Sequence, residues 1–306
     1  MTKLGSSDLD VFPLCLGGNV FGWTADEDAS FAVLDAYTAA GGNFIDTADV
    51  YSAWVPGHSG GESETIIGAW MAARGNRDDV IVATKVGHDR DLRREAILEG
   101  AKRSLERLGT DRIDLYYMHN DDLDTPFEES LAAFGELIRD GSVRYVGASN
   151  FTAERLAEAL EVADREGLPE IVALQNEYNL ISRAYEDGPA AVVAAHGLAA
   201  VPYYGLASGF LTGKYRPNGA AVDSPRAQGA VKQLDARGIA VLDALDAIAE
   251  AHEVAPAAVA LAWLAAQPTV VAPIASARTV EQLDDLLSFT TLTLSEAELE
   301  RLSSAG

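Results

Sequence analysis

Short apolar segments alternate with longer amphipathic segments along almost the whole chain. Each apolar segment is rich in valine, isoleucine, leucine or alanine, as expected of parallel strands that are buried on both faces. The candidate strands are one that ends near Leu16 and the segments 43–46, 80–85, 113–117, 143–147, 171–174, 198–203 and 270–272. Alternation of strand and helix over eight such segments predicts an α/β fold, the (β/α)8 barrel.

The segments between these strands have helical periodicity. In 93–108, the apolar residues Ile97, Ala101, Leu105 and Leu108 recur at helical spacing. Helices are predicted over 29–40, 93–108, 128–138, 152–166, 236–251 and 256–266. Thr152 suits a helix N-cap, and Pro256 suits the first position of a helix.

A doubly wound sheet is the main rival to the barrel. Such folds commonly bind dinucleotides through a Gly-x-Gly-x-x-Gly turn after an early strand, and this chain has none. No composition shift marks a domain boundary, and 306 residues with 48% hydrophobic content suffice for one large core. We therefore expect a single domain over 1–306.

The chain is strongly acidic, with a formal net charge of −24. Such a surface repels nucleic acid, and an anionic cofactor would need a local basic pocket. The single cysteine, Cys15, excludes an intramolecular disulfide. Because the N-terminal residues lack an apolar signal core and no apolar run approaches ~20 residues, we expect a cytoplasmic protein without a membrane segment.

Polar residues follow several candidate strands, where barrel enzymes carry their reactive groups. They are Asp46 with Tyr51 shortly after it, Lys85, His119, Ser149–Asn150 and Gln175–Asn176. A lysine in a partly buried barrel mouth requires a partner, and Asp46 is the obvious one. These residues therefore form the candidate reaction centre.

The residue types suggest proton transfer to a carbonyl. A phenol has a pKa near ~10, and a neighbouring ammonium lowers it. We expect Lys85 to do this to Tyr51, with Asp46 holding Lys85 charged. Tyr51 would then protonate a carbonyl oxygen as hydride reaches the carbon, and neutral His119 would orient that carbonyl through an N–H group.

Three segments together resemble the catalytic motifs of the aldo-keto reductases: 43–51 (NFIDTADVY), 82–85 (VATK) and 114–119 (DLYYMH). The resemblance runs from about Lys3 to the end of the chain. It implies a (β/α)8 TIM barrel with an N-terminal β-hairpin and extra C-terminal helices, which binds a nicotinamide cofactor without a Rossmann fold. It places the family's catalytic tetrad on Asp46, Tyr51, Lys85 and His119.

The resemblance also implies a cofactor site. The implied contacts to the cofactor are Asn19, Ser149, Asn150, Gln175, Tyr203, Leu206, Ser208, Gly209, Lys214, Arg226, Arg278, Gln282 and Asp285. Ser149, Asn150 and Gln175 match the residues that hold the carboxamide, and Tyr203 matches the aromatic that stacks on nicotinamide. The chain departs from the pattern at Tyr204, Gly205 and Leu286, which stand where Ser, Pro and Asn are usual.

The cationic residues of this set bear on the choice of cofactor. Lys214, Arg226 and Arg278 provide partners for a 2′-phosphate and favour NADP(H) over NAD(H). The long loop 52–61 would lie over the mouth, with Trp54 and its neighbours Trp23 or Phe21 lining the substrate pocket. His58 in this loop has no second metal ligand at a useful spacing, so no metal is expected. The expected activity is reversible, NADPH-dependent reduction of a small-molecule aldehyde or ketone.

Two alternatives remain open. Some relatives of the family are cofactor-sensing subunits of potassium channels with little catalysis, although the strand signals here begin almost at the N-terminus and leave little sequence for an inactivation arm. A barrel enzyme that forms a Schiff base through Lys85 is the other alternative, and an ion pair with Asp46 disfavours it. The sequence does not indicate an oligomeric state.

Overall fold

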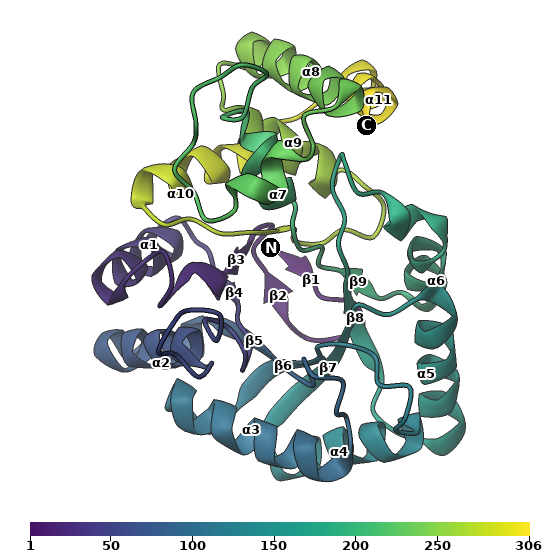
Figure 1. Cartoon of the computed structure of the whole chain (residues 1–306). Helices are drawn as coiled ribbons and strands as arrows, with labels where there is room; N and C mark the ends of the chain where they lie inside the picture. The colour runs from purple at the N-terminus through teal and green to yellow at the C-terminus, as the bar shows by residue number, and fades with distance from the viewer.

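A computed structural model describes all 306 residues, and its centre is a parallel eight-stranded sheet (Figure 1). The strands lie in the spatial order β10, β3, β4, β5, β6, β7, β8, β9. Their bounds are β3 (Cys15–Gly17), β4 (Phe44–Asp46), β5 (Ile81–Val86), β6 (Ile113–Met118), β7 (Val143–Ser149), β8 (Ile171–Gln175), β9 (Ala199–Ala200) and β10 (Ile274–Ala275). Every pair is parallel, which confirms the predicted α/β barrel class.

Backbone hydrogen bonds between β9 and the chain before β10 close the sheet. The N–H of Ala200 donates to the carbonyl of Thr269 at 2.9 Å, and the N–H of Val271 donates to the carbonyl of Ala200 at 2.9 Å. The predicted strand 270–272 pairs with β9 only through one bridge, between Val270 and Ala200, and the ladder with β3 forms later, at Ile274–Ala275, after Pro273. A proline has no N–H to donate to a ladder, so the regular pairing begins beyond it.

Helices surround the strands in Figure 1. They are α1 (Glu27–Ala39), α2 (Glu62–Arg74), α3 (Arg94–Leu108), α4 (Phe127–Asp140), α5 (Ala153–Glu166), α6 (Pro189–His196), α7 (Ala227–Val231), α8 (Ala236–His252), α9 (Pro256–Ala265), α10 (Val280–Leu287) and α11 (Glu296–Ala305). Each of the six predicted helices overlaps one of these, and Thr152 caps α5 by accepting the N–H of Arg155. The helices α10 and α11 follow the last strand, as the predicted C-terminal helices do.

The N-terminal hairpin lies across the centre of the barrel in Figure 1. Its strands β1 (Thr2–Lys3) and β2 (Asp10–Val11) pair antiparallel, which confirms the predicted hairpin. Leu4, Leu9 and Val11 are buried and belong to the same apolar cluster as Cys15 and the barrel residue Tyr117. The hairpin therefore closes the barrel at the amino ends of its strands and leaves the carboxyl ends for the site.

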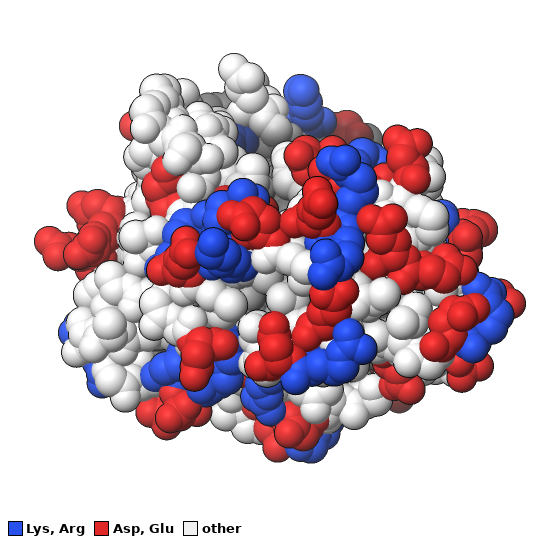
Figure 2. All heavy atoms as spheres, turned by 90° about the horizontal axis from the view of Figure 1, so that it is seen from below, with Lys and Arg blue, Asp and Glu red and all other residues white.

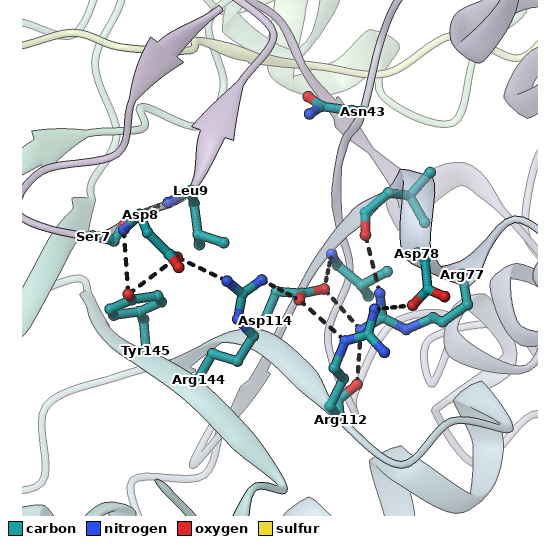
Figure 3. Close-up of polar contacts among 12 residues, drawn as sticks. Ser7, Asp8, Leu9, Asn43, Arg77, Asp78, Arg112, Asp114, Arg144 and Tyr145 are labelled. Atoms are coloured by element: carbon teal, nitrogen blue, oxygen red, sulfur yellow. Dashed lines mark hydrogen bonds and ion pairs between the residues drawn. The ribbon is translucent and has the colours of Figure 1, made fainter.

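A buried carboxylate ties this hairpin to the barrel (Figure 3). Asp114 in β6 accepts hydrogen bonds from Arg77 at 2.7 Å, from Arg144 at 3.1 Å and from the N–H of Val82 at 2.9 Å. Arg144 also donates to Asp8 in the hairpin loop at 2.7 Å. A buried carboxylate needs such partners to offset its lost hydration, so this network stabilises the floor of the barrel.

On the surface, acidic and basic side chains lie side by side rather than in separate fields (Figure 2). The guanidinium of Arg94 in α3 pairs with Glu136 in α4 at 2.6 Å, and many other arginines have a carboxylate partner as well. No single helix is long and apolar enough to cross a membrane; only α8 and α9 taken together meet the length and composition, and they are bent by 99° at their junction.

Candidate active site

A cavity of about 720 Å³ opens at the carboxyl ends of the barrel strands. It collects nearly all the residues predicted from the sequence for the site, although they come from separate strands and loops. Those that line it are Asn19, Trp23, Asp46, Tyr51, Trp54, His119, Ser149, Asn150, Gln175, Tyr203, Leu206, Ser208, Gly209, Lys214, Arg226, Arg278, Gln282 and Asp285. Lys85 lies behind this lining and has no exposed surface.

Lys85 in β5 is the centre of the polar cluster. Its Nζ donates to Asp46 Oδ2 at 2.6 Å, to the carbonyl of Thr47 at 2.7 Å and to the Tyr51 hydroxyl at 3.1 Å. Parallel strands end at the same edge of a sheet, which brings Asp46 at the end of β4 beside Lys85. The carboxylate and the carbonyl replace the water that the buried ammonium has lost.

The environment of Tyr51 differs from the expectation. Burial raises the pKa of Tyr51 well above its usual value, and the carboxylate of Asp46 acts in the same direction. The ammonium of Lys85 does not bring the Tyr51 pKa back down, because its charge is already compensated by the hydrogen bonds to Asp46 and to the Thr47 carbonyl. The Tyr51 hydroxyl therefore stays protonated at neutral pH, which is the form a proton donor requires.

His119 follows β6 and faces the same space. Its ring centroid lies 6.3 Å from that of Tyr51. Burial, with help from Lys85 and His88, lowers the pKa of His119 to about 2, so the imidazole is neutral, as predicted. Its Nδ1 is buried without a hydrogen-bond partner. A proton on Nδ1 would be a buried donor without an acceptor, so the N–H belongs on Nε2.

The residues expected to hold nicotinamide are connected to this cluster. Gln175 at the end of β8 donates from Nε2 to Asp46 Oδ1 at 2.9 Å. The hydroxyl of Tyr203 donates to Asn150 Oδ1 at 2.7 Å, and Asn150 Nδ2 donates to the carbonyl of His119 at 2.9 Å. These bonds connect the amide groups and the Tyr203 ring to Asp46 and to the backbone of His119, in the cavity that Tyr51 also lines.

The loop after β9 has a backbone that suits an anion. Ala207, Ser208 and Gly209 all have positive φ values, of 46°, 57° and 90°. Successive residues of this kind turn backbone N–H groups toward one concave space, which favours phosphate. Tyr204, which stands where the family has Ser, lines the cavity with 45% of its surface exposed.

Three cations around this loop have no carboxylate partner, although the chain is so acidic. They are Lys214, Arg226 and Arg278, and all three line the cavity. Burial lowers the pKa of Lys214 and of Arg226, and the charge of Arg278 lowers both further. Mutually repelling cations in a partly buried place indicate a site for a multiply charged anion.

The start of α10 completes this end of the cavity. Thr279 caps the helix by accepting the N–H of Gln282, and Gln282 Oε1 accepts the N–H of Arg278 at 3.0 Å. The positive end of a helix dipole favours phosphate groups. Leu286, which replaces the usual Asn, is buried at the cavity wall and offers no polar contact.

Another part of the cavity lining is aromatic. The ring centroids of Trp23 and Trp54 lie 5.5 Å apart, and that of Trp54 lies 6.1 Å from the Tyr51 ring. The guanidinium of Arg226 lies 5.2 Å from the centre of the Trp23 ring. Phe21, which was expected to line the pocket, does not: its side chain is fully buried in the core, and its carbonyl accepts from Ser52 at 2.9 Å.

Sequence reasoning missed several residues that line the pocket, among them His88, Asn120 and Ser276. Ser276 donates to Asn19 Oδ1 at 2.8 Å and so connects the strand β10 to the loop after β3. His88 lies three residues after Lys85, and its ring centroid is 5.0 Å from that of His119. No periodicity signals these residues, since they come from turns.

The fold and the cluster together define a class: a (β/α)8-barrel oxidoreductase whose buried lysine, aspartate and tyrosine stand at the carboxyl end of the sheet. The chain belongs to the aldo/keto reductase family, whose model matches residues 13–306.

Named relatives span nearly the whole chain. It is 34% identical to the "Uncharacterized oxidoreductase YrpG" of Bacillus subtilis, over 99% of this chain and 94% of that protein. It is 33% identical to "Aldo-keto reductase str7" of Strobilurus tenacellus, over 98% and 87%. It is also 36% identical to a "Probable voltage-gated potassium channel subunit beta" of Oryza sativa, over 92% and 88%.

Proposed function

We propose that this oxidoreductase reduces aldehydes or ketones to alcohols with NADPH, reversibly, and that Tyr51 supplies the proton. The observation that carries the proposal is the Tyr51 hydroxyl, which is held 3.1 Å from Lys85 Nζ and opens into the cavity. Bound NADPH would supply the hydride. The protein would supply a binding place for the carbonyl, the proton and the exclusion of water.

The residues present fit this cofactor at both ends. Asn150, Gln175 and Tyr203 offer amide groups and a ring for nicotinamide in the cavity that Tyr51 lines. Lys214 and Arg278 offer unpaired positive charge for phosphate groups at the other end of the same cavity. A 2′-phosphate would add charge that these cations can neutralise, and this favours NADP(H) over NAD(H).

The proton transfer follows from the geometry. A carbonyl oxygen bound between the Tyr51 hydroxyl and His119 Nε2 receives two hydrogen bonds, which orient it and stabilise the charge that develops on it. As its carbon accepts hydride, Tyr51 gives its proton to the oxygen. Lys85 stabilises the resulting phenolate from 3.1 Å, and the Asp46 carboxylate keeps the lysine in place.

The test is a panel of aldehydes and ketones with NADPH and with NADH, followed at the nicotinamide absorbance. We expect turnover of several carbonyls with NADPH and a lower kcat/KM with NADH. Binding of NADPH without turnover of any carbonyl would contradict the proposal. It would instead favour a cofactor-sensing role, which the similarity to a protein named as a potassium channel subunit makes the second candidate.

A further inference from the structure

A second histidine, His88, lies beside His119 in the lining of the cavity. Their ring centroids are 5.0 Å apart and the ring planes are inclined by 68°. His88 is an exposed residue that lines the cavity together with Trp54 and Asn120. It is thus one of the groups that a substrate bound at His119 would meet.

The backbone holds His88 at this place. Gly87 has a φ of +79°, a value that a residue with a side chain rarely adopts, and it turns the chain directly after β5. Asn120 Nδ2 then donates to the carbonyl of His88 at 2.7 Å. These two features hold the backbone at His88, and from there the imidazole reaches the ring of His119.

The two rings are bonded differently. No protein group forms a hydrogen bond with either ring nitrogen of His88, and the ring is accessible. In His119 the buried Nδ1 leaves only Nε2 to face a ligand. The cavity therefore presents two neighbouring imidazoles to one molecule, of which His119 serves the reacting carbonyl in the proposed function.

We infer that His88 is a specificity residue that hydrogen-bonds an oxygen on the carbon next to the reacting carbonyl. The favoured substrates are then α-oxygenated carbonyl compounds, that is, α-hydroxy aldehydes, α-hydroxy ketones and 1,2-dicarbonyls. This inference rests on the proposed function. Two oxygens on adjacent carbons are near neighbours, and a neutral imidazole can donate to a carbonyl or accept from a hydroxyl.

The rest of such a molecule would lie along Trp54, whose exposed face continues from Tyr51 at a centroid distance of 6.1 Å. A carbonyl compound without the second oxygen would still bind Tyr51 and His119, but it would leave His88 to water. The difference between the two kinds of substrate is therefore one hydrogen bond in a partly exposed place, which corresponds to about a 3- to 10-fold preference.

The test compares matched substrates in three proteins. The pairs are 1-phenyl-1,2-propanedione with 1-phenyl-1-propanone, and glyceraldehyde with propanal. The proteins are the wild type, His88→Phe, which keeps a ring beside His119 but removes the polar nitrogens, and His88→Gln, which keeps a donor and an acceptor. Because α-oxygenation changes intrinsic reactivity in all three proteins alike, the ratio of kcat/KM within each pair is compared between proteins.

We expect His88→Phe to lower the ratio about 3- to 10-fold in both pairs, because the variant weakens turnover of the α-oxygenated member more than that of the simple carbonyl. His88→Gln should keep most of the wild-type ratio. An equal loss on both members of a pair would show that His88 acts only by packing on His119, and would overturn the inference, as would an unchanged ratio. If the wild type reduced no carbonyl at all, the proposed function itself would fail.

Discussion

The Tyr51 hydroxyl and the Lys85 ammonium lie 3.1 Å apart, and Lys85 is also 4.8 Å from the centre of the Tyr51 ring. The ammonium thus touches the edge of the phenol that would carry negative charge after proton transfer, while burial keeps that phenol protonated beforehand. The contact with Lys85 stabilises the Tyr51 phenolate, which forms after proton transfer, more than it stabilises the neutral phenol. A residue that donates a proton to a developing alkoxide needs this difference.

Replacing Tyr51 with Phe should remove the proton donor and leave the fold intact. We expect kcat for carbonyl reduction to fall about 10²- to 10⁴-fold, the usual contribution of a positioned acid, with NADPH affinity nearly unchanged. Steady-state kinetics and cofactor titration by fluorescence measure the two quantities. Tyr145, which lies on the opposite side of the barrel and bonds Asp8, provides the matched Tyr→Phe control. Wild-type turnover by the Tyr51 variant would refute its role as acid.

Replacing Asp46 with Asn should destabilise the protein as well as slow it. The substitution leaves Lys85 buried with a weaker partner, and breaking a buried pair in this way costs about 3–5 kcal/mol. Urea unfolding followed by circular dichroism measures the loss. Replacing Asp10 with Asn breaks the exposed pair with Lys3 and should cost about 0–1 kcal/mol. Equal losses in the two variants would contradict the buried role of Asp46.

The two directions of the reaction should differ in their pH dependence. Reduction needs protonated Tyr51, whose pKa is raised, so this requirement is met from acidic to neutral pH and is lost only as pH rises toward that pKa. Alcohol oxidation needs the phenolate, so its kcat should increase with pH through the alkaline range. His119, with a pKa of about 2, adds no step above pH ~3. A reduction rate that rises with pH in the alkaline range, an oxidation rate that falls there, or a step near pH 6.5 removed by His119→Gln would contradict these assignments.

Replacing Arg278 with Gln should weaken NADPH more than NADH. The Arg278 side chain has no carboxylate partner, so its replacement breaks no ion pair. Its charge repels Lys214 and Arg226 and lowers the pKa of both. We expect a loss of about 10-fold or more in NADPH affinity, since a charge-assisted hydrogen bond is worth about 1.5–3 kcal/mol. Calorimetric titration of both cofactors measures the selectivity. Arg301→Gln, in the distant helix α11, is the control, and a parallel loss for NADH would place Arg278 away from the 2′-phosphate.

The positions of Asp46, Lys85, His119 and Gln175 could be predicted because parallel strands in a barrel end at one mouth, whatever their loops do. No comparable rule predicts where the side chains of loop residues lie. His88 reaches the cavity through the φ of Gly87 and a bond from Asn120, neither of which leaves a periodic pattern in the sequence. Phe21 is aromatic, as residues of a substrate pocket often are, but its side chain is buried in the core. The sequence does not distinguish a pocket position from a core position, because the packing of the folded chain decides between them.

The direction of the Tyr51 pKa also required the structure. The sequence placed an ammonium near a phenol and predicted a lowered pKa, but the outcome depends on how completely water is excluded and on how far Asp46 neutralises Lys85. The eighth strand shifted for a local reason, because Pro273 interrupts the ladder between the predicted segment and the observed strand.

Replacing Asp114 with Asn should lower stability without changing catalysis. Asp114 is 1% exposed and holds Arg77 and Arg144 at the floor of the barrel, at the opposite end from the cavity (Figure 3). The variant keeps the shape but leaves the partly buried guanidiniums without their shared anion, so we expect a loss of about 2–4 kcal/mol in the free energy of unfolding. The control is Asp78→Asn: the Asp78 side chain is 89% exposed where it pairs with Arg112, so this substitution should cost less than 1 kcal/mol.

Because no residue of the network lines the cavity, kcat and KM of the folded Asp114 variant should equal those of the wild type. A specific loss of NADPH affinity or turnover in the still-folded variant would contradict this prediction, because it would show that the Asp114 network positions the reaction centre.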